Sequence, residues 1–305
     1  MPNKEDILTG WFARQSKAPK SRFPIGIGDD MAQVRLAADG TVLITTDMLL
    51  DGTHFDLSTA TMEQAGVKAM NCSLSDCAAM ATIPVCAVAA VAMPKGFGAA
   101  RLKQLHKGIV RAGRKFDCHL IGGDITAWHD PGSRFAVNVT MLSIPAPGID
   151  PLRRNGAKPG DAICVTGTLG GSLRQKHLTF TPRVREALAI ASAAKIHAMM
   201  DITDGLSTDL NRICRQSGVG AILDVQRIPL SKDAKRTADP LASALHDGED
   251  FELLFTLHPR QYGRLENLGG IPVTRIGIIT ECKSLVFRGI DGRIRPLQPK
   301  GYDHL

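Results

Sequence analysis

The sequence predicts an α/β (α+β) protein made of two domains, each built around a mixed sheet. The 305 residues, 44% of them hydrophobic, are enough for two ordinary domains with separate cores. Strand-like and helix-like segments alternate in both halves of the chain. Between the halves, near residue 146, prolines and glycine cluster in SIPAPGIDP, as is typical of a linker. We therefore expect one domain over residues 1–145 and a second over 146–305.

The first half contains four apolar runs and two helical patterns. Strands are expected over residues 41–47, 87–94, 119–124 and 135–144. The first is expected to end at Asp47, and the third to run into glycines at its end. Helical spacing of small and apolar residues predicts a helix over 61–81, and an amphipathic pattern predicts another over 99–116.

The second half repeats this mixture. A strand is expected over 161–167, and a helix over 182–198 with Thr181 as N-cap and Pro182 as its first residue. A second helix is expected over 205–218, ended by Gly218. Further strands are expected at 221–225, 251–257, 272–279 and 284–289.

Composition excludes several classes of protein. The net charge is +7, but the basic residues are dispersed and lack interleaved aromatics, so we expect no nucleic-acid partner. No apolar run reaches the roughly 18 residues of a membrane span, and the N-terminus does not have a secretory pattern. The seven cysteines include no CxxC pair, so we expect free thiols rather than a zinc site. A cytoplasmic location follows.

Aspartates are the most informative residues, because several follow apolar strands and have Gly, Thr or Ser neighbours. The set comprises Asp29, Asp30, Asp47, Asp76, Asp124, Asp201 and Asp204. Any one of them alone is more often only a turn former or a helix cap. Together, without cysteine or histidine partners, they are typical of a magnesium site for phosphate chemistry. The usual nucleotide-binding motifs are absent, including GxxxxGK[ST] and GxGxxG, so ATP would bind by another route.

Nine motifs then follow one another in order: GIGDD, TTDMLLDGTHF, NCSLSDCAAM, LIGGDITA, RRNGAKPGD, VTGTLGG, MMDITDGLSTDL, DGEDFELLF and KGYDHL. This series resembles the bacterial thiamine-monophosphate kinase family of the aminoimidazole-ribonucleotide-synthetase-like superfamily. The resemblance runs from near residue 5 to the C-terminus. It implies an N-terminal domain that dimerises and a C-terminal α/β domain, with ATP and several magnesium ions between them. The implied partners are ATP, thiamine monophosphate and a second copy of the chain.

The resemblance also implies roles for individual residues. The magnesium ligands would be Asp30, Thr45, Thr46, Asp47, Asp76, Asp124, Asp201 and Asp204. ATP contacts would come from Gly123, Asp124, Arg154 and Thr203, with Arg153 an alternative to Arg154. Contacts to thiamine monophosphate would come from His54, Glu249 and Tyr302. His54 is alternatively a polar turn residue, and Tyr302 is alternatively an anchor for the C-terminal tail.

The implied reaction is direct, in-line transfer of a phosphoryl group from ATP to thiamine monophosphate, the last step of thiamine diphosphate biosynthesis. The acceptor is already an ionised phosphate, so no general base and no catalytic residue of that kind is assigned. The chain departs from the family at Thr203, where serine is usual, and at His246 and Asp247, where small residues are usual. A short segment, 172–181, replaces a longer stretch.

Other readings stay open at this stage. A selenophosphate synthetase would carry a reactive cysteine near its N-terminus, whereas the first cysteine here is Cys72. The hydrogenase-maturation branch ends in cysteine, whereas this sequence ends in His304 and Leu305. The purine-pathway synthetase is a third relative, which the GYDHL ending does not favour. A protein that binds nucleotide or metal without catalysis is the alternative of a different class.

Overall fold

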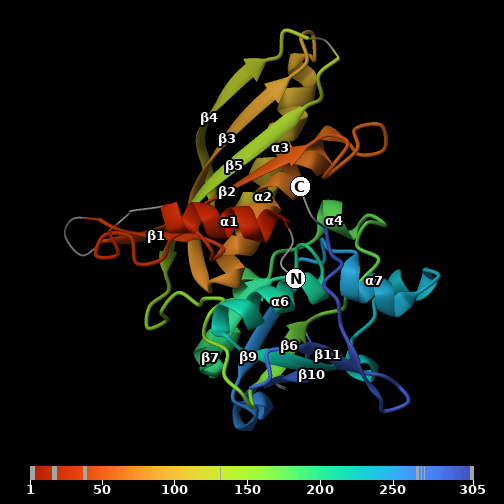
Figure 1. The fold of residues 1–305 in the computed structure, drawn as a ribbon. Coiled ribbons are helices and arrows are strands. Elements are labelled where there is room, and N and C mark those ends of the chain that lie inside the picture. Colours follow the sequence, from red (N-terminus) through yellow and green to blue (C-terminus); the bar gives the residue numbers. More distant parts are fainter. Residues whose placement is uncertain are drawn as a thin grey trace.

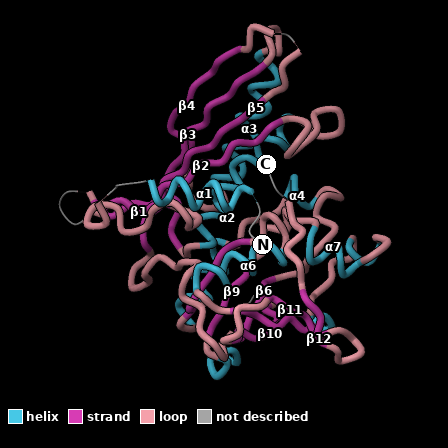
Figure 2. Tube along the Cα trace, in the orientation of Figure 1, coloured by secondary structure: helices cyan, strands magenta, loops and turns pink. Residues whose placement is uncertain are grey.

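The computed structural model describes residues 4–15, 19–36, 40–130, 132–265, 268, 270 and 272–302. It contains two mixed sheets, so the predicted fold class is confirmed. Figure 1 shows one sheet at the top of the molecule and the other at the bottom. In Figure 2, helix α2 lies between the strands of the two sheets. No helix of the described part is long and apolar enough to cross a membrane.

The first sheet has five strands in the order β1-β2-β5-β3-β4. They are β1 (Ala32–Arg35), β2 (Thr41–Leu50), β3 (Thr82–Met93), β4 (His119–Ala127) and β5 (Ala136–Pro145). Strand β4 runs parallel to β3, and the other neighbours are antiparallel. Because β1 pairs only with residues 41–44 of β2, the second half of β2 forms an edge beside the cleft described below.

Helices α2 (Met62–Ala79) and α3 (Ala99–Arg114) pack on the inner face of this sheet. Thr61 and Gln64 form a reciprocal capping box at the start of α2. The two helices approach each other closely through two glycines. A Cβ on Gly66 would lie 2.2 Å from the Leu105 carbonyl oxygen, and one on Gly108 would lie 2.1 Å from that of Glu63. Any larger residue would force the helices apart.

The outer face of the first sheet exposes large apolar side chains. Met48 on β2 is 61% exposed, and Ile121 on β4 is 66% exposed. Ile44 and Val88 add to this surface. An exposed apolar area of this kind is typical of a surface that binds another protein.

The second sheet has seven strands in the order β12-β11-β8-β10-β6-β9-β7. They are β6 (Ala162–Thr166), β7 (Ile196–Asp201), β8 (Gly220–Asp224), β9 (Leu253–Leu257), β10 (Val273–Thr280), β11 (Leu285–Arg288) and β12 (Ile294–Pro296). Only β8 and β11 pair in parallel. Every residue of β6 and β9 is buried, so both faces at the centre of this sheet are covered.

The remaining helices are α1 (Lys4–Gln15), α4 (Lys176–Thr179), α5 (Val184–Ala193), α6 (Leu206–Ser217) and α7 (Pro240–His246). Three short 3-10 segments cover Val225–Arg227, Ala234–Arg236 and Pro259–Arg264. Helix α6 ends at Gly218, whose φ of 70° is the left-handed conformation that glycine favours, so the predicted stop is confirmed.

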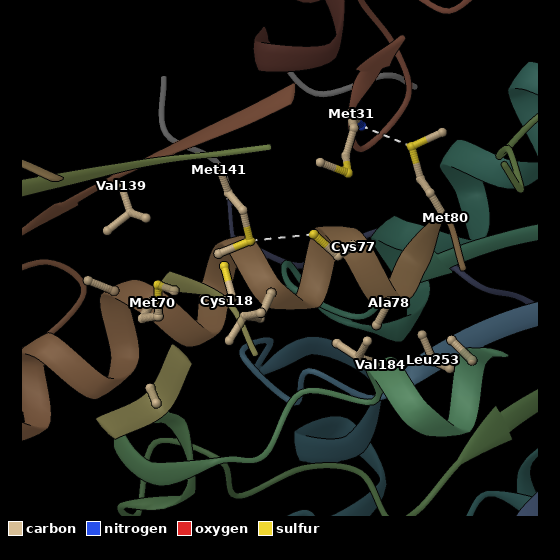
Figure 3. Packing of buried hydrophobic residues seen from close by; sticks show 14 of the residues in the cluster. Met31, Met70, Cys77, Ala78, Met80, Cys118, Val139, Met141, Val184 and Leu253 are labelled. Atoms are coloured by element: carbon tan, nitrogen blue, oxygen red, sulfur yellow. Dashed lines mark hydrogen bonds between the residues drawn. The ribbon is translucent and has the colours of Figure 1, made fainter. Parts of the chain in front are cut away.

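One aliphatic and sulfur-rich core joins the two halves of the molecule. It extends from the first sheet through α2 to α5, β7 and β9. In Figure 3, the Met31 amide donates to Met80 Sδ at 3.2 Å, and Cys77 Sγ lies 3.4 Å from Met141 Sδ. A second core lies on the other face of the second sheet, beneath α6. Helix α2 therefore belongs to the first sheet by sequence and to both halves by packing.

Three sequence predictions need correction. The helix expected over 182–198 is shorter and consists of α5 alone. Its N-cap is Arg183 rather than Thr181, and Ile196 already belongs to β7. Local spacing cannot reveal that β7 is held by its pairing with β9. Strand β2 continues to Leu50, so Asp47 does not end it, and β4 runs through its glycines to Ala127. The sequence pattern did not predict α1, α4, α7, β1 and β12.

Candidate active site

A cleft of about 830 Å³ lies between the two halves. Its lining comes from α1, the exposed edge of β2, α2, the linker, the segment from β7 to α6, the turn before β9 and the C-terminal tail. Ten of the fourteen predicted site residues line it: Thr46, Asp47, His54, Asp76, Arg154, Asp201, Thr203, Asp204, Glu249 and Tyr302. The cleft therefore brings together motifs that lie far apart in the sequence.

Three carboxylates meet at one end of the cleft. Asp30 precedes β1, Asp76 lies on α2, and Asp201 ends β7. One carboxylate oxygen from each lies within 4.8 Å of the others. Burial, followed by the charges of neighbouring aspartates, raises the pKa of Asp76 and of Asp201 well above the usual range. The three carboxylates repel one another when they are ionised, so a bound cation would stabilise the cluster.

Hydroxyl groups orient these carboxylates. Thr45 Oγ1 donates a short hydrogen bond to Asp76, and Ser75 Oγ donates to Asp201 at 2.5 Å. Asp47, one strand residue from Thr46, accepts from Ser73 Oγ at 2.6 Å. Burial is the main reason that the pKa of Asp47 is raised to about 6. Thr45 and Asp47 point to the inner face of the sheet, toward α2.

Arg154 joins the linker to the acidic cluster. Its Nε and Nη2 donate to the two carboxylate oxygens of Asp30 at 3.0 and 2.6 Å. Asp29 holds the backbone amide of Arg154 at 2.9 Å and the side chain of Arg153 at 3.2 Å. Because Arg154 lines the cleft and Arg153 does not, the geometry favours Arg154 as the cationic contact in this site.

Asp204 and its neighbours form the next part of the wall. Arg212 donates a short hydrogen bond to Asp204 and another to Asp209 at 2.9 Å. Asp209 also accepts from the amides of Thr203 and Asp204, at 3.0 and 3.1 Å, and so fixes the turn. Mainly because of burial, the pKa of Asp209 is raised to about 7. Asp209 and Arg212 were not among the predicted site residues, although their i, i+3 spacing on α6 could have indicated a pair.

The other end of the cleft is the part beside Lys68, which lies eight positions before Asp76 on α2. His54 and Glu249 line it, whereas Tyr302 lines the cleft beside Asp204. His54 Nδ1 accepts from the Leu50 amide at 3.0 Å, so the proton of the neutral ring is on Nε2. Glu249 forms an ion pair with Lys68 at 2.6 Å. Lys68 was not among the predicted site residues, because nothing in a helical pattern marks one lysine as buried.

The C-terminal tail is fixed by its backbone. The Tyr302 amide donates to the Asp204 carbonyl oxygen at 3.0 Å, and the Gly301 amide donates to Thr208 Oγ1 at 3.0 Å. A Cβ on Gly301 would lie 1.8 Å from that same carbonyl oxygen, so only glycine fits there. Tyr302 is 48% exposed and lines the cleft. Asp303, His304 and Leu305 of the closing motif lie outside the described residues.

Gly123 and Asp124 do not join this group within one chain. Asp124 pairs with Ala90 on β3, Ala90 with Asn138 on β5, and Asn138 with Met48 on β2. Residues opposite one another in a sheet share a face, so Asp124 lies on the outer face, three strands from β2. Thr46 also faces outward, where its Oγ1 lies 2.9 Å from Thr140 Oγ1.

The residues that depart from the family pattern have clear partners. His246 Nδ1 lies 2.9 Å from Ser207 Oγ, and Asp247 accepts from the Gly171 amide at 3.2 Å. Asp247 lines the cleft, whereas His246 is not among its lining residues. The short segment 172–181 contains only the single turn of α4.

Two family models match successive parts of the chain. The model described as AIR synthase related protein, N-terminal domain, matches residues 28–144, and the corresponding C-terminal domain matches residues 158–288. Solved hydrogenase maturation proteins are 16–20% identical with TM-scores of 0.69 to 0.73, which is a likeness of fold alone.

Curated relatives match over nearly the full length. A thiamine-monophosphate kinase of Rhodopirellula baltica is 34% identical, with 92% of this chain and 91% of the relative covered. One from Escherichia coli K12 is also 34% identical, with the same coverage. The structure of AaThiL complexed with AMPPCP and TMP is 27% identical and covers 99% of this chain and 97% of its own, with a TM-score of 0.83. Together, these similarities show that the chain belongs to the thiamine-monophosphate kinase family.

Proposed function

We propose that this protein transfers the γ-phosphoryl group of ATP to thiamine monophosphate and so produces thiamine diphosphate. The observation that carries the proposal is the cleft, which has a cluster of carboxylates at one end, His54 and Glu249 at the other, and the Tyr302 ring on its wall. A polyphosphate with hard cations suits the first end. A flat, cationic organic group suits the second end, because the protein offers the Glu249 carboxylate and, on the cleft wall, the Tyr302 ring to such a group.

The carboxylate end fits magnesium. Its donor set is made of oxygen atoms only, and three of the carboxylates converge within 4.8 Å. We propose that Asp30, Asp47, Asp76, Asp201 and Asp204, with the hydroxyl of Thr45, hold several Mg²⁺ ions. The hydroxyl of Thr46, which faces the outer side of the sheet, is left out of this set. Bound there, magnesium would neutralise the charge that develops on the transferred phosphoryl group. The raised pKa values of Asp47 and Asp76 are what closely spaced, buried carboxylates without a cation exhibit.

The side chains of the protein have a binding and orienting role in this proposal. Arg154 is proposed to move between Asp30 and the phosphates of ATP, because a planar guanidinium can form bidentate hydrogen bonds with a carboxylate or with a phosphate. The backbone of the turn at Thr203 is proposed to contact ATP. No side chain is needed as a general base, because the attacking oxygen belongs to an ionised phosphate. We propose that transfer is direct and in line, without a phosphoenzyme, and that the reaction takes place in the cytoplasm as the last step of thiamine diphosphate formation.

We further propose a homodimer that uses the outer face of the first sheet. Its support is the exposed Met48, Ile121, Ile44 and Val88 on that face. Three strand spacings, roughly 14 Å, separate Asp124 from Met48 within one chain. In a dimer, Asp124 of the partner subunit could instead face the β2 edge of this chain, with Gly123 beside it at the nucleotide. The domain division at residues 1–145 and 146–305 belongs to the same proposal.

The reaction is tested by incubating the purified protein with ATP, Mg²⁺ and thiamine monophosphate and separating the products by chromatography. Thiamine diphosphate should form from the monophosphate, and not from free thiamine or without Mg²⁺. Bound ATP with no product would reject the proposed acceptor. Hydrolysis of ATP that is independent of thiamine monophosphate would reject the kinase assignment for this cleft.

The shared site is tested by mixing two inactive variants, Asp47→Asn and Asp124→Asn. In a mixed dimer, one cleft keeps Asp47 and receives Asp124 from the other subunit, so random mixing should restore about a quarter of wild-type activity. If Asp124 acts within its own chain, both clefts of the mixed dimer are damaged and no activity returns. Sedimentation of Ile121→Asp tests the interface separately, and a wild-type mass for that variant would contradict it.

A further inference from the structure

Lys68 is a fully buried lysine in the middle of α2. The exposed fraction of its side chain is 0%, and it is one of the largest completely buried side chains among the described residues. Its Nζ donates to Glu249 Oε1 at 2.6 Å and makes a short hydrogen bond to the His54 carbonyl oxygen. One ammonium group thereby connects a helix of the first half, the turn after β2 and the turn before β9.

The turn that carries Glu249 has an unusual backbone. Glu249 and Phe251 have φ values of 52° and 50°, a conformation that non-glycine residues rarely adopt. The Glu249 amide donates to the Thr203 carbonyl oxygen at 2.6 Å, and the Phe251 ring stacks on Phe180 with centroids 3.8 Å apart. The backbone of Glu249 is therefore fixed by its neighbours, while its long side chain still has rotamers to choose from.

Lys68 selects one of those rotamers. It binds Oε1 of Glu249, whereas Oε2 has no hydrogen-bond partner within the described part of the chain. The side chain of Glu249 is 21% exposed and lines the cleft, so a ligand can reach it. The carboxylate is thus left with acceptor capacity for a donor group on a ligand.

Stability alone does not account for this pair. A buried ion pair is often replaced by apolar residues of similar volume without loss of stability, because desolvation offsets the attraction between the charges. Lys68 also reaches no other carboxylate among the salt bridges of the described residues. What its position does achieve is a fixed relation between His54 and Glu249, which come from separate parts of the chain.

We propose that Lys68 is a positioning residue for the organic end of the acceptor. It holds the Glu249 carboxylate ready to accept from an N–H donor, such as the amino group of an aminopyrimidine, and it fixes the His54 turn beside it. Lys68 itself does not touch the substrate or the phosphates. This inference rests on the proposed function, because it deepens the role of the substrate end of that same cleft.

The test compares Lys68→Met, Glu249→Gln and the double variant in the full-length protein. Each single change should raise the KM for thiamine monophosphate about tenfold or more, the scale of losing a hydrogen bond to a charged group. The KM for ATP should stay within about twofold, because ATP binds at the other end of the cleft. The double variant should be no worse than the more damaged single variant, because both changes remove one contact.

A matched control is Lys107→Met, since Lys107 pairs with Glu63 at 3.0 Å but its side chain is 70% exposed. It should change neither KM. If Lys68→Met fails to fold, Lys68→Met/Glu249→Met replaces the pair by apolar groups, and its KM for thiamine monophosphate should match that of Glu249→Gln. An unchanged KM for thiamine monophosphate, equal losses for both substrates, or multiplied losses in the double variant would each overturn the inference.

Calorimetry with thiamine monophosphate separates this inference from the proposed function. Wild-type protein that binds thiamine monophosphate without turnover would contradict the proposed reaction. The same titration would still test Lys68, because Lys68→Met should weaken the binding about tenfold or more. Wild-type turnover together with undiminished binding in Lys68→Met would overturn only the role of Lys68. No binding to wild type would overturn both.

Discussion

The negative charge of buried carboxylates is compensated differently at the two ends of the cleft. At one end, Asp30, Asp76 and Asp201 bring carboxylate oxygens within 4.8 Å of one another. At the other end, the single carboxylate of Glu249 lies 2.6 Å from the ammonium of Lys68. At the first end, Arg154 pairs with Asp30 at 2.6 Å, and the proposed Mg²⁺ would balance the remaining negative charge. At the second end, Lys68 of the chain itself neutralises Glu249. The difference indicates where inorganic ions and where an organic group would bind.

The largest expected effect comes from changing Asp76 to Asn. It should lower kcat/KM by about 10²–10³-fold, the usual loss when one preorganised electrostatic contact is removed. In EDTA, the same change should increase the free energy of unfolding, because it removes one of three mutually repelling carboxylates. Kinetics and chemical denaturation measure the two effects, with the exposed Asp117→Asn as control. A lower free energy of unfolding for Asp76→Asn in EDTA would contradict the proposed repulsion between these carboxylates.

Addition of Mg²⁺ should stabilise one end of the cleft only. At 100 times its Kd, a ligand that binds only the folded state adds about 2.7 kcal/mol to the free energy of unfolding. The melting temperature of the wild type should therefore rise by several degrees. Asp76→Asn should lose most of this shift, and Glu249→Gln should retain it. An equal loss in both variants would mean that the two ends are not independent.

The pH dependence of stability tests Asp250, a buried carboxyl group next to Glu249 at the substrate end. Asp250 follows Glu249, is buried, and accepts from the Gly170 amide at 2.9 Å, and burial is the main reason that its pKa is raised to about 7. The unfolded chain has a pKa near 3.9, so between these values the folded state binds more protons. Stability should therefore fall as pH rises, by roughly 2–3 kcal/mol between pH 5 and 8. Denaturation of the wild type and Asp250→Asn at both values isolates this contribution, and parallel pH profiles would contradict it.

The smallest expected effect is on the ring of Tyr302. Tyr302→Ala should raise the KM for thiamine monophosphate by about 2–10-fold, the worth of one aromatic contact. The KM for ATP and the Mg²⁺-induced shift in melting temperature should not change, because the tail is held by its backbone. Tyr302→Phe is the matched control and should resemble the wild type. A rise in the KM for ATP alone would mean that the ring contacts the nucleotide rather than thiamine monophosphate.

Much of the fold was predictable because its signals are local. The capped helix α2, the glycine at the end of α6 and most central strands follow from spacing and caps. The helix expected over 182–198 was wrong because Ile196–Asp201 pairs with β9, and pairing between distant segments leaves no local mark. Asp47 and Asp124 were expected at strand ends, yet both lie within strands.

The sequence by itself determined the fold class, the family and the aspartates from which the site is built, because residue types and their order along the chain carry that information. Tertiary structure decided which aspartates meet. It gathers Asp30, Asp76 and Asp201, places Asp124 on another face, and buries Lys68 against Glu249. The reason is physical. Whether a charge is desolvated or paired depends on which segments lie beside it, and those segments are separated by up to 181 positions in the chain.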